Sequence, residues 1–412
     1  MTPAARLQMA IDVLEGLEKS TQPADRFLKD WFRSRRFAGS KDRRAIAERV
    51  FAILRHRATL AHRMDSDAPR ALMIASLLDA GDDPAALFTG GYGPAPLTDA
   101  ERAAMAAPRA EPPLWVRGEF PAFLEPELTR AFGDRVLDEM LALQTRAPTD
   151  LRINTLKASR DDVLAQLQAA GIDAAPTPFA PHGIRIAAGE GNAQLSQSPL
   201  FASGAFEFQD EAAQIASLLA GAKPGMRVCD LAAGAGGKSL AMAAAMENRG
   251  EIVACDIRGA ALAELETRAA RAGVTIIKTV PLEHAAPEGV FDIVFVDAPC
   301  SGTGTWRRQP ELRWRLTPQR LAQLMATQDA LLDRAAALTA PGGKLFYATC
   351  SILPSENEDR VDAFLSRHPG FRHESARDAW SGRDIPGLAM DFRASPDMTA
   401  TDGFYAAMLR RM

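Results

Sequence analysis

The sequence predicts an α/β fold built on an open, largely parallel sheet, with a ligand site at the carboxyl ends of the strands. The apolar run 290–296 is rich in β-branched and aromatic residues and stops at Asp297, as expected for a buried parallel strand. A second apolar run, 345–348, is followed closely by Cys350. Ligands of open α/β sheets bind outside the carboxyl ends of the strands, so Cys300 and Cys350 are expected to face one crevice.

A third pattern, earlier in the chain, indicates a nucleoside-binding half of the sheet. Residues 226–231 predict a strand, the loop A-A-G-A-G-G-K-S follows, and a helix is expected over 239–248. Glycine lets the backbone approach a ligand closely, and a helix amino terminus favours an anionic or electron-rich group. The strand expected over 252–256 ends in Asp256, the place of the ribose-binding acid in the Rossmann arrangement. Spacing alone leaves S-adenosylmethionine and a dinucleotide as alternatives.

Length and composition suit a protein of two or three globular domains. The 412 residues are 47% hydrophobic, and no apolar run approaches the roughly 20 residues of a membrane span. The first residues are amphipathic and lack the apolar core of a signal peptide, so we expect a cytoplasmic protein with no membrane partner. The four cysteines have no C-x-x-C spacing, which predicts neither a disulfide framework nor a metal site. Cys229 and Cys255 lie within strand patterns and are expected to be buried thiols.

The first third of the chain is expected to be helical. Residues 1–80 have helical spacing of apolar residues, with Ser40 as a candidate N-cap, and 115–146 are helical again. Between them, 81–113 is rich in Gly, Pro, Ala and Asp and predicts a linker. The net charge is −4, yet 19–63 has an excess of nine positive charges. This region is either a local basic surface for nucleic acid or a solvated helical bundle.

The remaining elements alternate between strands and helices. Expected strands cover 151–157, 184–186, 206–208, 274–280 and part of 401–410, and expected helices cover 160–170, 212–220, 260–272, 319–338 and 358–367. Asp210 can cap the helix that follows it, or Gln209 and Asp210 simply end a hairpin. Segment 306–315 holds four arginines and two tryptophans. It suits contact with single-stranded RNA, or alternatively a buried Trp314 with solvated arginines.

Two motifs at the strand ends carry a family resemblance. D-A-P-C-S-G-T-G at 297–304 and Y-A-T-C-S-I-L-P-S-E-N at 347–357 closely resemble the cysteine motifs of the Sun/RsmB family of S-adenosylmethionine-dependent RNA (cytosine-5) methyltransferases. The resemblance covers nearly everything from Leu151 onward, and 36–57 is similar to part of the NusB-like domain of bacterial members. One departure lies in the glycine loop, where the family has Ala-Pro and this chain has Gly234-Ala235.

The resemblance implies a fold of three parts. An all-α NusB-like RNA-binding domain would cover 1–145, a small RRM-like α+β subdomain 146–210, and a Rossmann-like, seven-stranded methyltransferase domain with an antiparallel last strand 211–412. It also implies S-adenosylmethionine as cofactor, RNA as partner, no metal, and a monomer.

The resemblance also implies the site residues. Cys350 would be the nucleophile and Cys300 would assist release, while Asp297 and Lys238 would recognise the base. The cofactor-binding residues would be Ala232, Ala233, Gly234, Gly236, Gly237, Lys238, Asp256, Arg258, Glu283 and Asp297. Glu283 stands near the place of a family acid, in a segment that departs from the family pattern. The neighbouring His284 is expected to be a loop histidine.

The chemistry explains why two cysteines are needed. Carbon 5 of cytosine is a poor nucleophile until a thiolate adds at carbon 6, and the thiolate must later be expelled. The base must be unpaired or flipped to reach the site. The resemblance therefore implies methyl transfer to carbon 5 of a cytosine in RNA through a covalent cysteine adduct, and the NusB-like stretch implies 16S ribosomal RNA as substrate. The alternatives are a transfer-RNA cytosine-5 methyltransferase and a non-catalytic RNA-binding ribosome-assembly factor.

Overall fold

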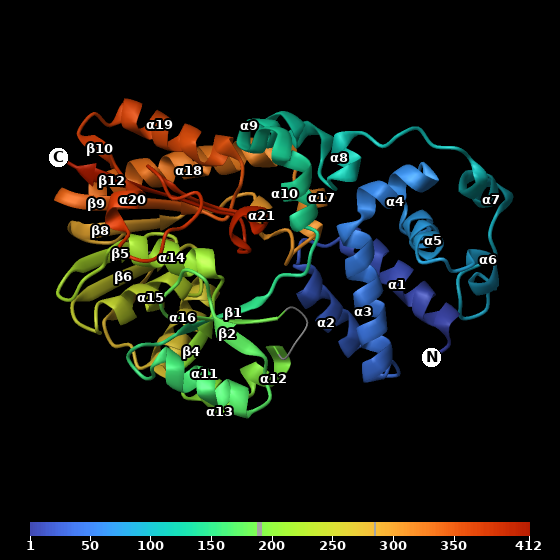
Figure 1. Ribbon diagram of the computed structural model, residues 1–412, viewed down its shortest axis with the longest axis horizontal. Coiled ribbons are helices and arrows are strands. Elements are labelled where there is room, and N and C mark those ends of the chain that lie inside the picture. The colour runs from blue at the N-terminus through green and yellow to red at the C-terminus, as the bar shows by residue number, and fades with distance from the viewer. Residues whose placement is uncertain (188–191, 284–285) are drawn as a thin grey trace. The chain divides into compact units, whose positions relative to one another are not determined.

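The computed structural model describes residues 1–187, 192–283 and 286–412, and Figure 1 gives its helices and strands. His284, expected to be a loop histidine, lies outside the described residues. The chain forms two compact units, one of residues 1–145 together with 306–316, the other of 146–305 together with 317–412. No helix in the described part of the chain is long and apolar enough to cross a membrane.

The first unit is helical, as the sequence predicts. Its longer helices are α1 (Pro3–Glu18), α2 (Ala24–Arg33), α3 (Ser40–Arg55), α4 (Arg57–Met64) and α5 (Pro69–Asp79). Thr2 caps α1 by accepting from the Ala5 N–H, and Leu7, Ile11 and Leu14 of that helix point into the apolar core. The expected N-cap at Ser40 is wrong, because Ser40 is the first helical residue and Gly39 precedes it without a side-chain bond.

The Gly- and Pro-rich stretch 81–113 is more ordered than a linker. It contains α6 (Pro84–Leu87) and α7 (Asp99–Ala106), and a capping box between Thr98 and Glu101 starts α7. Arg70 of α5 pairs with Glu101 at 2.6 Å, and Phe88 is buried. These contacts hold the stretch against the helices that precede it. The unit continues with α8 (Leu114–Arg117), η1 (Ala122–Leu124), α9 (Glu125–Phe132), η2 (Gly133–Arg135) and α10 (Val136–Ala142).

Segment 306–316, which includes α17 (Glu311–Arg315), is folded into this helical unit. Trp306 and Arg313 are fully buried, and Arg313 donates to the carbonyl oxygens of Glu119 at 3.2 Å and Leu143 at 2.8 Å. The Trp314 indole N–H donates to the Leu54 carbonyl. The expectation that this segment contacts RNA is therefore wrong for Trp306 and Arg313, which stabilise the helical unit instead. Arg308 of the same segment is exposed.

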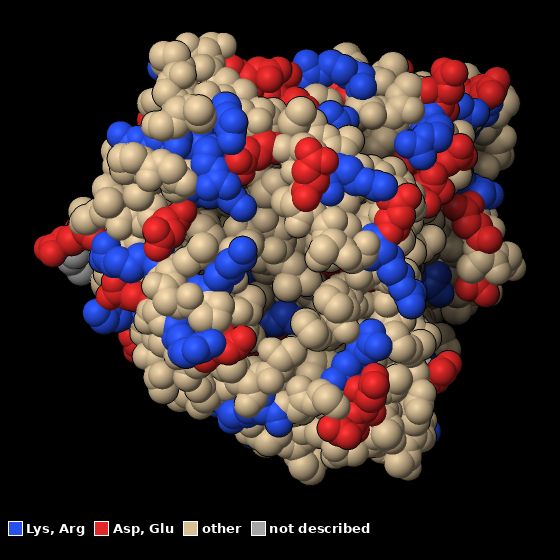
Figure 2. All heavy atoms as spheres, turned by 60° about the vertical axis from the view of Figure 1, so that its left-hand side comes forward, with Lys and Arg blue, Asp and Glu red and all other residues tan. Residues whose placement is uncertain are grey.

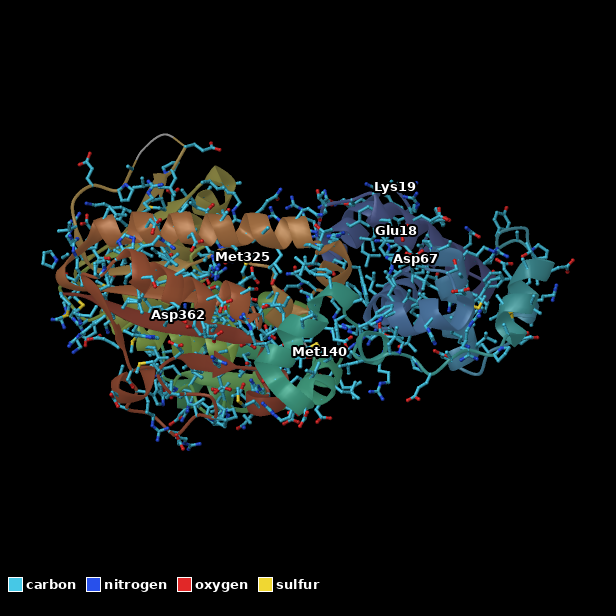
Figure 3. The ribbon with its side chains drawn as sticks, turned by 90° about the horizontal axis from the view of Figure 1, so that it is seen from above. Glu18, Lys19, Asp67, Met140, Met325 and Asp362 are labelled. Carbon is cyan, nitrogen blue, oxygen red and sulfur yellow. The ribbon has the colours of Figure 1, made fainter. Side chains whose placement is uncertain are left out.

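Many cations of the basic stretch 19–63 are paired with acids of the same unit. Arg57 forms ion pairs with Glu18 at 2.8 Å and Asp67 at 3.4 Å, two carboxylates labelled in Figure 3. Arg63 pairs with Asp79, and Arg44 with Glu48. On the face drawn in Figure 2, Lys and Arg side chains are likewise interspersed with Asp and Glu. RNA contact by the basic stretch stays a prediction.

The second unit begins with a small antiparallel sheet. Its strands β1 (Thr149–Ile153), β2 (Ala174–Pro176), β3 (Gly183–Ile186) and β4 (Phe206–Phe208) have the order β2-β3-β1-β4. Its helices are α11 (Arg160–Ala169), α12 (Asn192–Ser196) and α13 (Pro199–Ala202), and Val163 and Leu167 of α11 pack on Leu151 and Ile153. The expected small α+β subdomain is confirmed.

The large sheet has the order β10-β12-β9-β8-β5-β6-β7, with β11 added on β12. Its strands are β5 (Arg227–Asp230), β6 (Glu251–Asp256), β7 (Ile277–Pro281), β8 (Phe291–Asp297), β9 (Thr339–Thr349), β10 (Phe371–Glu374), β11 (Phe392–Ala394) and β12 (Phe404–Arg411). Strands β5 to β9 pair in parallel, whereas β12 runs antiparallel to β9 and β10. The Rossmann-like sheet with its antiparallel last strand is confirmed, but it has eight strands, because the short β11 is added to the expected seven.

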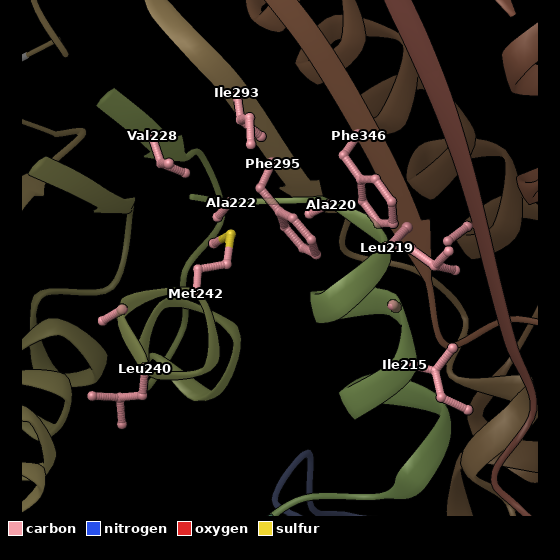
Figure 4. Packing of buried hydrophobic residues seen from close by; sticks show 14 of the residues in the cluster. Ile215, Leu219, Ala220, Ala222, Val228, Leu240, Met242, Ile293, Phe295 and Phe346 are labelled. Atoms are coloured by element: carbon pink, nitrogen blue, oxygen red, sulfur yellow. The ribbon is translucent and has the colours of Figure 1, made fainter. Parts of the chain in front are cut away.

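Helices cover both faces of the large sheet (Figure 1). One face packs on α14 (Glu211–Leu219), α15 (Gly237–Ala245) and α16 (Gly259–Ala272), the other on α18 (Pro318–Leu338) and α19 (Glu358–Arg367). Short elements complete the unit: η3 (Thr303–Thr305), η4 (Pro354–Glu356), α20 (Ala376–Ala379) and α21 (Pro396–Thr399). In the first of these layers the rings of Phe295 and Phe346 stack at 4.9 Å above Ile215 and Leu219 of α14 (Figure 4). The packing fixes the strand ends that carry the site.

Glu119 is the anchor of the helical unit that we expect to be most sensitive to mutation. Its buried carboxylate accepts from the N–H groups of Ala58 at 2.7 Å and Thr59 at 3.0 Å, in the first turn of α4, and from the Thr59 hydroxyl. Glu119→Ala should lower the free energy of unfolding by about 3 kcal/mol, because each buried donor left without an acceptor costs about 1–3 kcal/mol. Chemical denaturation measures the change. The exposed Glu111→Ala is the control, and equal stability of the two variants would contradict this role.

Candidate active site

The carboxyl ends of four neighbouring strands of the large sheet lie side by side. Asp230, Asp256 and Asp297 are the last residues of β5, β6 and β8, and Cys350 directly follows β9. Cys300 lies three residues beyond β8, and its sulfur is 3.4 Å from that of Cys350. The structure thus brings together the two cysteines, which are 50 residues apart in sequence.

The two cysteine loops are joined by the buried carboxylate of Glu356. It accepts from the Ser301 N–H at 2.9 Å, from the Ser301 hydroxyl, and from the Gln328 side-chain amide at 2.9 Å. The Thr303 and Ser351 hydroxyls lie 3.1 Å apart, and the Gly304 N–H donates to the Cys350 carbonyl at 3.0 Å. Sequence reasoning assigned no role to Glu356, although it belongs to the second cysteine motif. The sequence signal that could have indicated this role is the run of small polar residues beside each cysteine, which can hydrogen-bond to a carboxylate.

The two thiols have different environments. The hydrogen bond with Cys350, burial, and the nearby Glu356 together raise the pKa of Cys300 well above its usual value. Cys300 is thus held as a neutral thiol at neutral pH. Cys350 lies close enough to Lys238 for the two groups to interact electrostatically.

Lys238 lies in the first turn of α15 and contacts the end of β8. Its ammonium is 2.5 Å from the Asp297 carboxylate and 5.5 Å from the centre of the Phe404 ring. Burial opposes the charge on Lys238, but the attraction of Asp297 outweighs it and raises the pKa of the ammonium. The structure therefore supplies a fixed positive charge beside the cysteines. Phe404 was not among the expected site residues.

The glycine loop leads from β5 to α15 and adopts a conformation that requires glycine. Gly236 has φ +79°, and a Cβ there would lie 2.4 Å from the Leu265 side chain. Gly237 is the first residue of α15, and the N–H of Ala233 donates to the Cys255 carbonyl at 2.8 Å. Ala232 and Gly234 complete the loop and are both half-buried. The loop conformation thus depends on glycine at 236, where the backbone packs directly against α16.

Asp256 organises the neighbouring strand end. Its carboxylate accepts from the Gly234 N–H at 2.8 Å and from both the backbone and the side chain of Arg258. Glu283 follows the end of β7 and is exposed. Within the described part of the chain, its carboxylate forms no hydrogen bond or ion pair with the other expected cofactor residues. The structure brings Asp256 and Arg258 to the loop but leaves Glu283 apart from them.

Two arginines support the glycine loop from behind, and sequence reasoning missed both. Arg152 of β1 donates to the Gly237 carbonyl at 2.5 Å and to the Gln209 side chain at 2.8 Å. Arg268 of α16 donates to the Ala235 carbonyl at 2.7 Å and pairs with Glu207 of β4. The small subdomain therefore contacts the loop through charged side chains.

The two residues that follow β4 have separate roles. Gln209 accepts from Arg152, whereas Asp210 caps α14 by accepting from the Ala212 N–H. The prediction that Asp210 is an N-cap is confirmed. Among the described residues, no three His, Cys, Asp or Glu side chains are grouped as a metal ion would require.

Comparisons with known proteins give consistent matches. Residues 217–410 match the family model "16S rRNA methyltransferase RsmB/F", and 120–190 match the ferredoxin-like domain of RsmF/B-like methyltransferases. A probable ribosomal RNA small subunit methyltransferase B of Synechocystis is 35% identical over 71% of this chain and 67% of its own length. The small subunit methyltransferase F of Serratia proteamaculans is 33% identical over 71% of this chain and 63% of its own length. A crystal structure described as PH0851 has 26% identity and a TM-score of 0.79, covering 100% of this chain and 99% of that one.

The buried carboxyl of Asp230 should give stability a specific pH dependence. It accepts from the Ser239 hydroxyl at 2.5 Å, and burial raises its pKa from 3.8 to about 7. Between pH 4 and 7 the unfolded chain loses this proton while the folded chain keeps it, so its contribution to the free energy of unfolding falls as pH rises. The fall is about 4 kcal/mol at 1.36 kcal/mol per pKa unit.

Asp230→Asn cannot ionise and should therefore lose less stability than the native chain between pH 4 and 7. Urea denaturation at several pH values measures the difference. Asp256→Asn is the control, because the hydrogen bonds of Asp256 lower its pKa and its titration lies below this range. Parallel curves for the native chain and Asp230→Asn would contradict the raised pKa.

Proposed function

We propose that this chain, which belongs to the 16S rRNA methyltransferase RsmB/F family, transfers a methyl group to carbon 5 of a cytosine in small-subunit ribosomal RNA. The observation that carries the proposal is the 3.4 Å separation of Cys300 and Cys350, next to the pair of Lys238 and Asp297. The chain spans about two thirds of the length of the curated relatives that it matches. The substrate is therefore proposed for this chain from their names and from its own site.

The residues at the strand ends fit S-adenosylmethionine. Gly236 lets the loop turn and pack closely against α16, because a side chain there would collide with Leu265. Asp256, at the end of β6, has the position of a ribose-binding acid. The backbone beside it is formed by the other proposed loop residues, Ala232, Ala233, Gly234 and Gly237. Arg258 and Asp297 complete the proposed set, while Glu283 would need to turn toward the loop. When bound, the cofactor supplies a methyl group on a sulfonium.

The proposed reaction starts with Cys350. Its thiolate adds to carbon 6 of the cytosine, which forms an S–C bond and moves electron density to carbon 5 and to ring nitrogen 3. The positive charge of Lys238 stabilises the thiolate before addition. The Lys238 ammonium can donate to ring nitrogen 3 or to the ring carbonyl, and the Asp297 carboxylate, 2.5 Å away, holds that ammonium in place. Carbon 5 is then nucleophilic enough to accept the methyl group.

The release step assigns a role to Cys300. After methylation the proton on carbon 5 must leave, and the bond between carbon 6 and the Cys350 sulfur must break. The carbon 5 proton passes to a solvent base, and the neutral Cys300 thiol, 3.4 Å from the Cys350 sulfur, can donate its proton to that sulfur as the bond to carbon 6 breaks. We therefore propose Cys350, which the family resemblance implies as the nucleophile, for the attack and Cys300 for the release.

The roles of the cysteines can be separated with 16S ribosomal RNA and S-adenosylmethionine. Cys350→Ala should lose methylation by at least about a thousandfold, the order expected for loss of a nucleophile, and form no covalent RNA complex. Cys300→Ala should transfer the methyl group once and then stall as a denaturant-stable protein–RNA adduct. Denaturing gels and mass analysis of the RNA measure both outcomes.

The buried Cys229→Ala is the matched control and should turn over without an adduct. Adducts in Cys350→Ala would reverse the two assignments. If 5-methylcytosine is found in transfer RNA but not in ribosomal RNA, the substrate is transfer RNA. If it is found in neither, the proposal that the chain is an enzyme is contradicted.

Arg152 is proposed as a positioning residue for the cofactor loop. Arg152→Met should raise the dissociation constant for S-adenosylmethionine about tenfold, since a hydrogen bond from a charged group contributes about 1.5–3 kcal/mol. The rate at saturating cofactor should change little, and Arg152→Lys should restore part of the affinity. Calorimetric titration measures the constants.

Arg185→Met is the control, because Arg185 belongs to the same small sheet and pairs with Asp150 instead of the loop. An unchanged cofactor affinity in Arg152→Met, or an equal loss in Arg185→Met, would remove the positioning role.

A further inference from the structure

A pocket lies at the other end of the strands of the large sheet, away from the cysteine site. It has a volume of about 470 Å³ and is formed where β8 and β9 begin, where β12 ends, and beside the carboxyl end of α14. Lys344 and Thr349 are separated by about 17 Å along β9, at a rise of about 3.3 Å per residue. The pocket is therefore separate from the cysteine site.

Three cations line this pocket. Lys223 follows α14, Lys344 lies on β9, and Arg410 lies on β12. Lys344 and Arg410 are directly paired in the antiparallel register of the two strands. Like charges in this arrangement repel each other and destabilise the sheet.

The pairing of these cations is incomplete. Arg410 is bound by Glu374 through two hydrogen bonds, at 2.8 and 3.0 Å. Asp292, the acid in the pocket wall, accepts from the Arg227 N–H at 2.8 Å. Lys344 has one long hydrogen bond, 3.4 Å to the Ala220 carbonyl, and Lys223 is exposed. Among the residues that the structure describes, neither of these two ammonium groups forms an ion pair with an acid.

The half-buried Lys344 is the least compensated of these groups. Burial lowers the pKa of its ammonium, the attraction of Glu374 only partly opposes this, and Arg410 and Lys223 lower it further. A bound anion would relieve both the repulsion and the lost hydration. The pocket is also large enough to hold more than one water molecule.

We propose that this pocket binds a phosphoryl group, presented either by an RNA backbone or by free phosphate. A phosphoryl group carries up to two negative charges and several acceptor oxygens, which match three converging cations better than a carboxylate does. Lys344 and Lys223 supply the free ammonium groups, and Arg410 adds charge from the adjoining strand.

Calorimetric titration with inorganic phosphate, at ionic strength held constant with chloride, tests the site in the full chain. Native protein should bind saturably, and Lys344→Met should raise the dissociation constant about tenfold, equivalent to about 1.4 kcal/mol. Lys223→Met should raise it by a smaller factor and serves as the second variant if Lys344→Met does not fold. Lys278→Met is the control, because this exposed lysine pairs with Glu251 outside the pocket.

No saturable phosphate binding by native protein, or the same constant in all variants, would overturn the proposal. The failure would be separate from that of the methyltransferase, because the titration contains neither cofactor nor RNA. A second measurement identifies the source of the group. An RNA backbone predicts that Lys344→Met weakens RNA binding and reduces its salt slope by about one unit. Unchanged RNA binding, together with lost phosphate binding, assigns the pocket to free phosphate.

Discussion

The carboxylate of Glu356 is the interaction on which the geometry of the site depends. It lies in the loop after Cys350 and binds the backbone and the hydroxyl of Ser301, the residue next to Cys300. Two strand ends fix only where each loop starts, and the Glu356 contacts fix where the loops meet. The charge has a second effect, because it helps to keep the Cys300 thiol protonated. One buried acid thus joins the two loops and also helps to raise the pKa of Cys300.

In the glycine loop, too, one residue permits the backbone conformation and other residues hold it in place. Gly236 permits the turn, but Arg152 and Arg268 hold the carbonyl groups on either side of it. The family resemblance leads us to expect a proline at position 235, whereas this chain has alanine there and binds its carbonyl with Arg268. A side-chain hydrogen bond can restrict a loop that lacks the rigid ring of proline. The departure in sequence therefore does not leave the loop unsupported.

Sequence predicted the strands and their ends well, because buried parallel strands are continuous apolar runs and their polar ends are visible in the residue pattern. Asp297, Cys300 and Cys350 were expected at one edge for that reason. Segment 306–316 was harder, since an arginine for RNA and an arginine for buried carbonyls look the same in sequence. The partners of Arg313, at positions 119 and 143, are more than 160 residues away along the chain. The same holds for Arg152, whose role depends on the distant carbonyl of Gly237.

The place of segment 306–316 has a consequence for how the protein is made. The helical unit takes its first 145 residues from the start of the chain and its last piece from far downstream. At a synthesis rate of about 5–20 residues per second, about 10 to 30 s separate the emergence of these two parts. During this interval the carbonyl groups of Glu119 and Leu143 have no arginine to bind. The helical unit can therefore complete its core only after about three quarters of the chain has been synthesised, although most of that unit is made first.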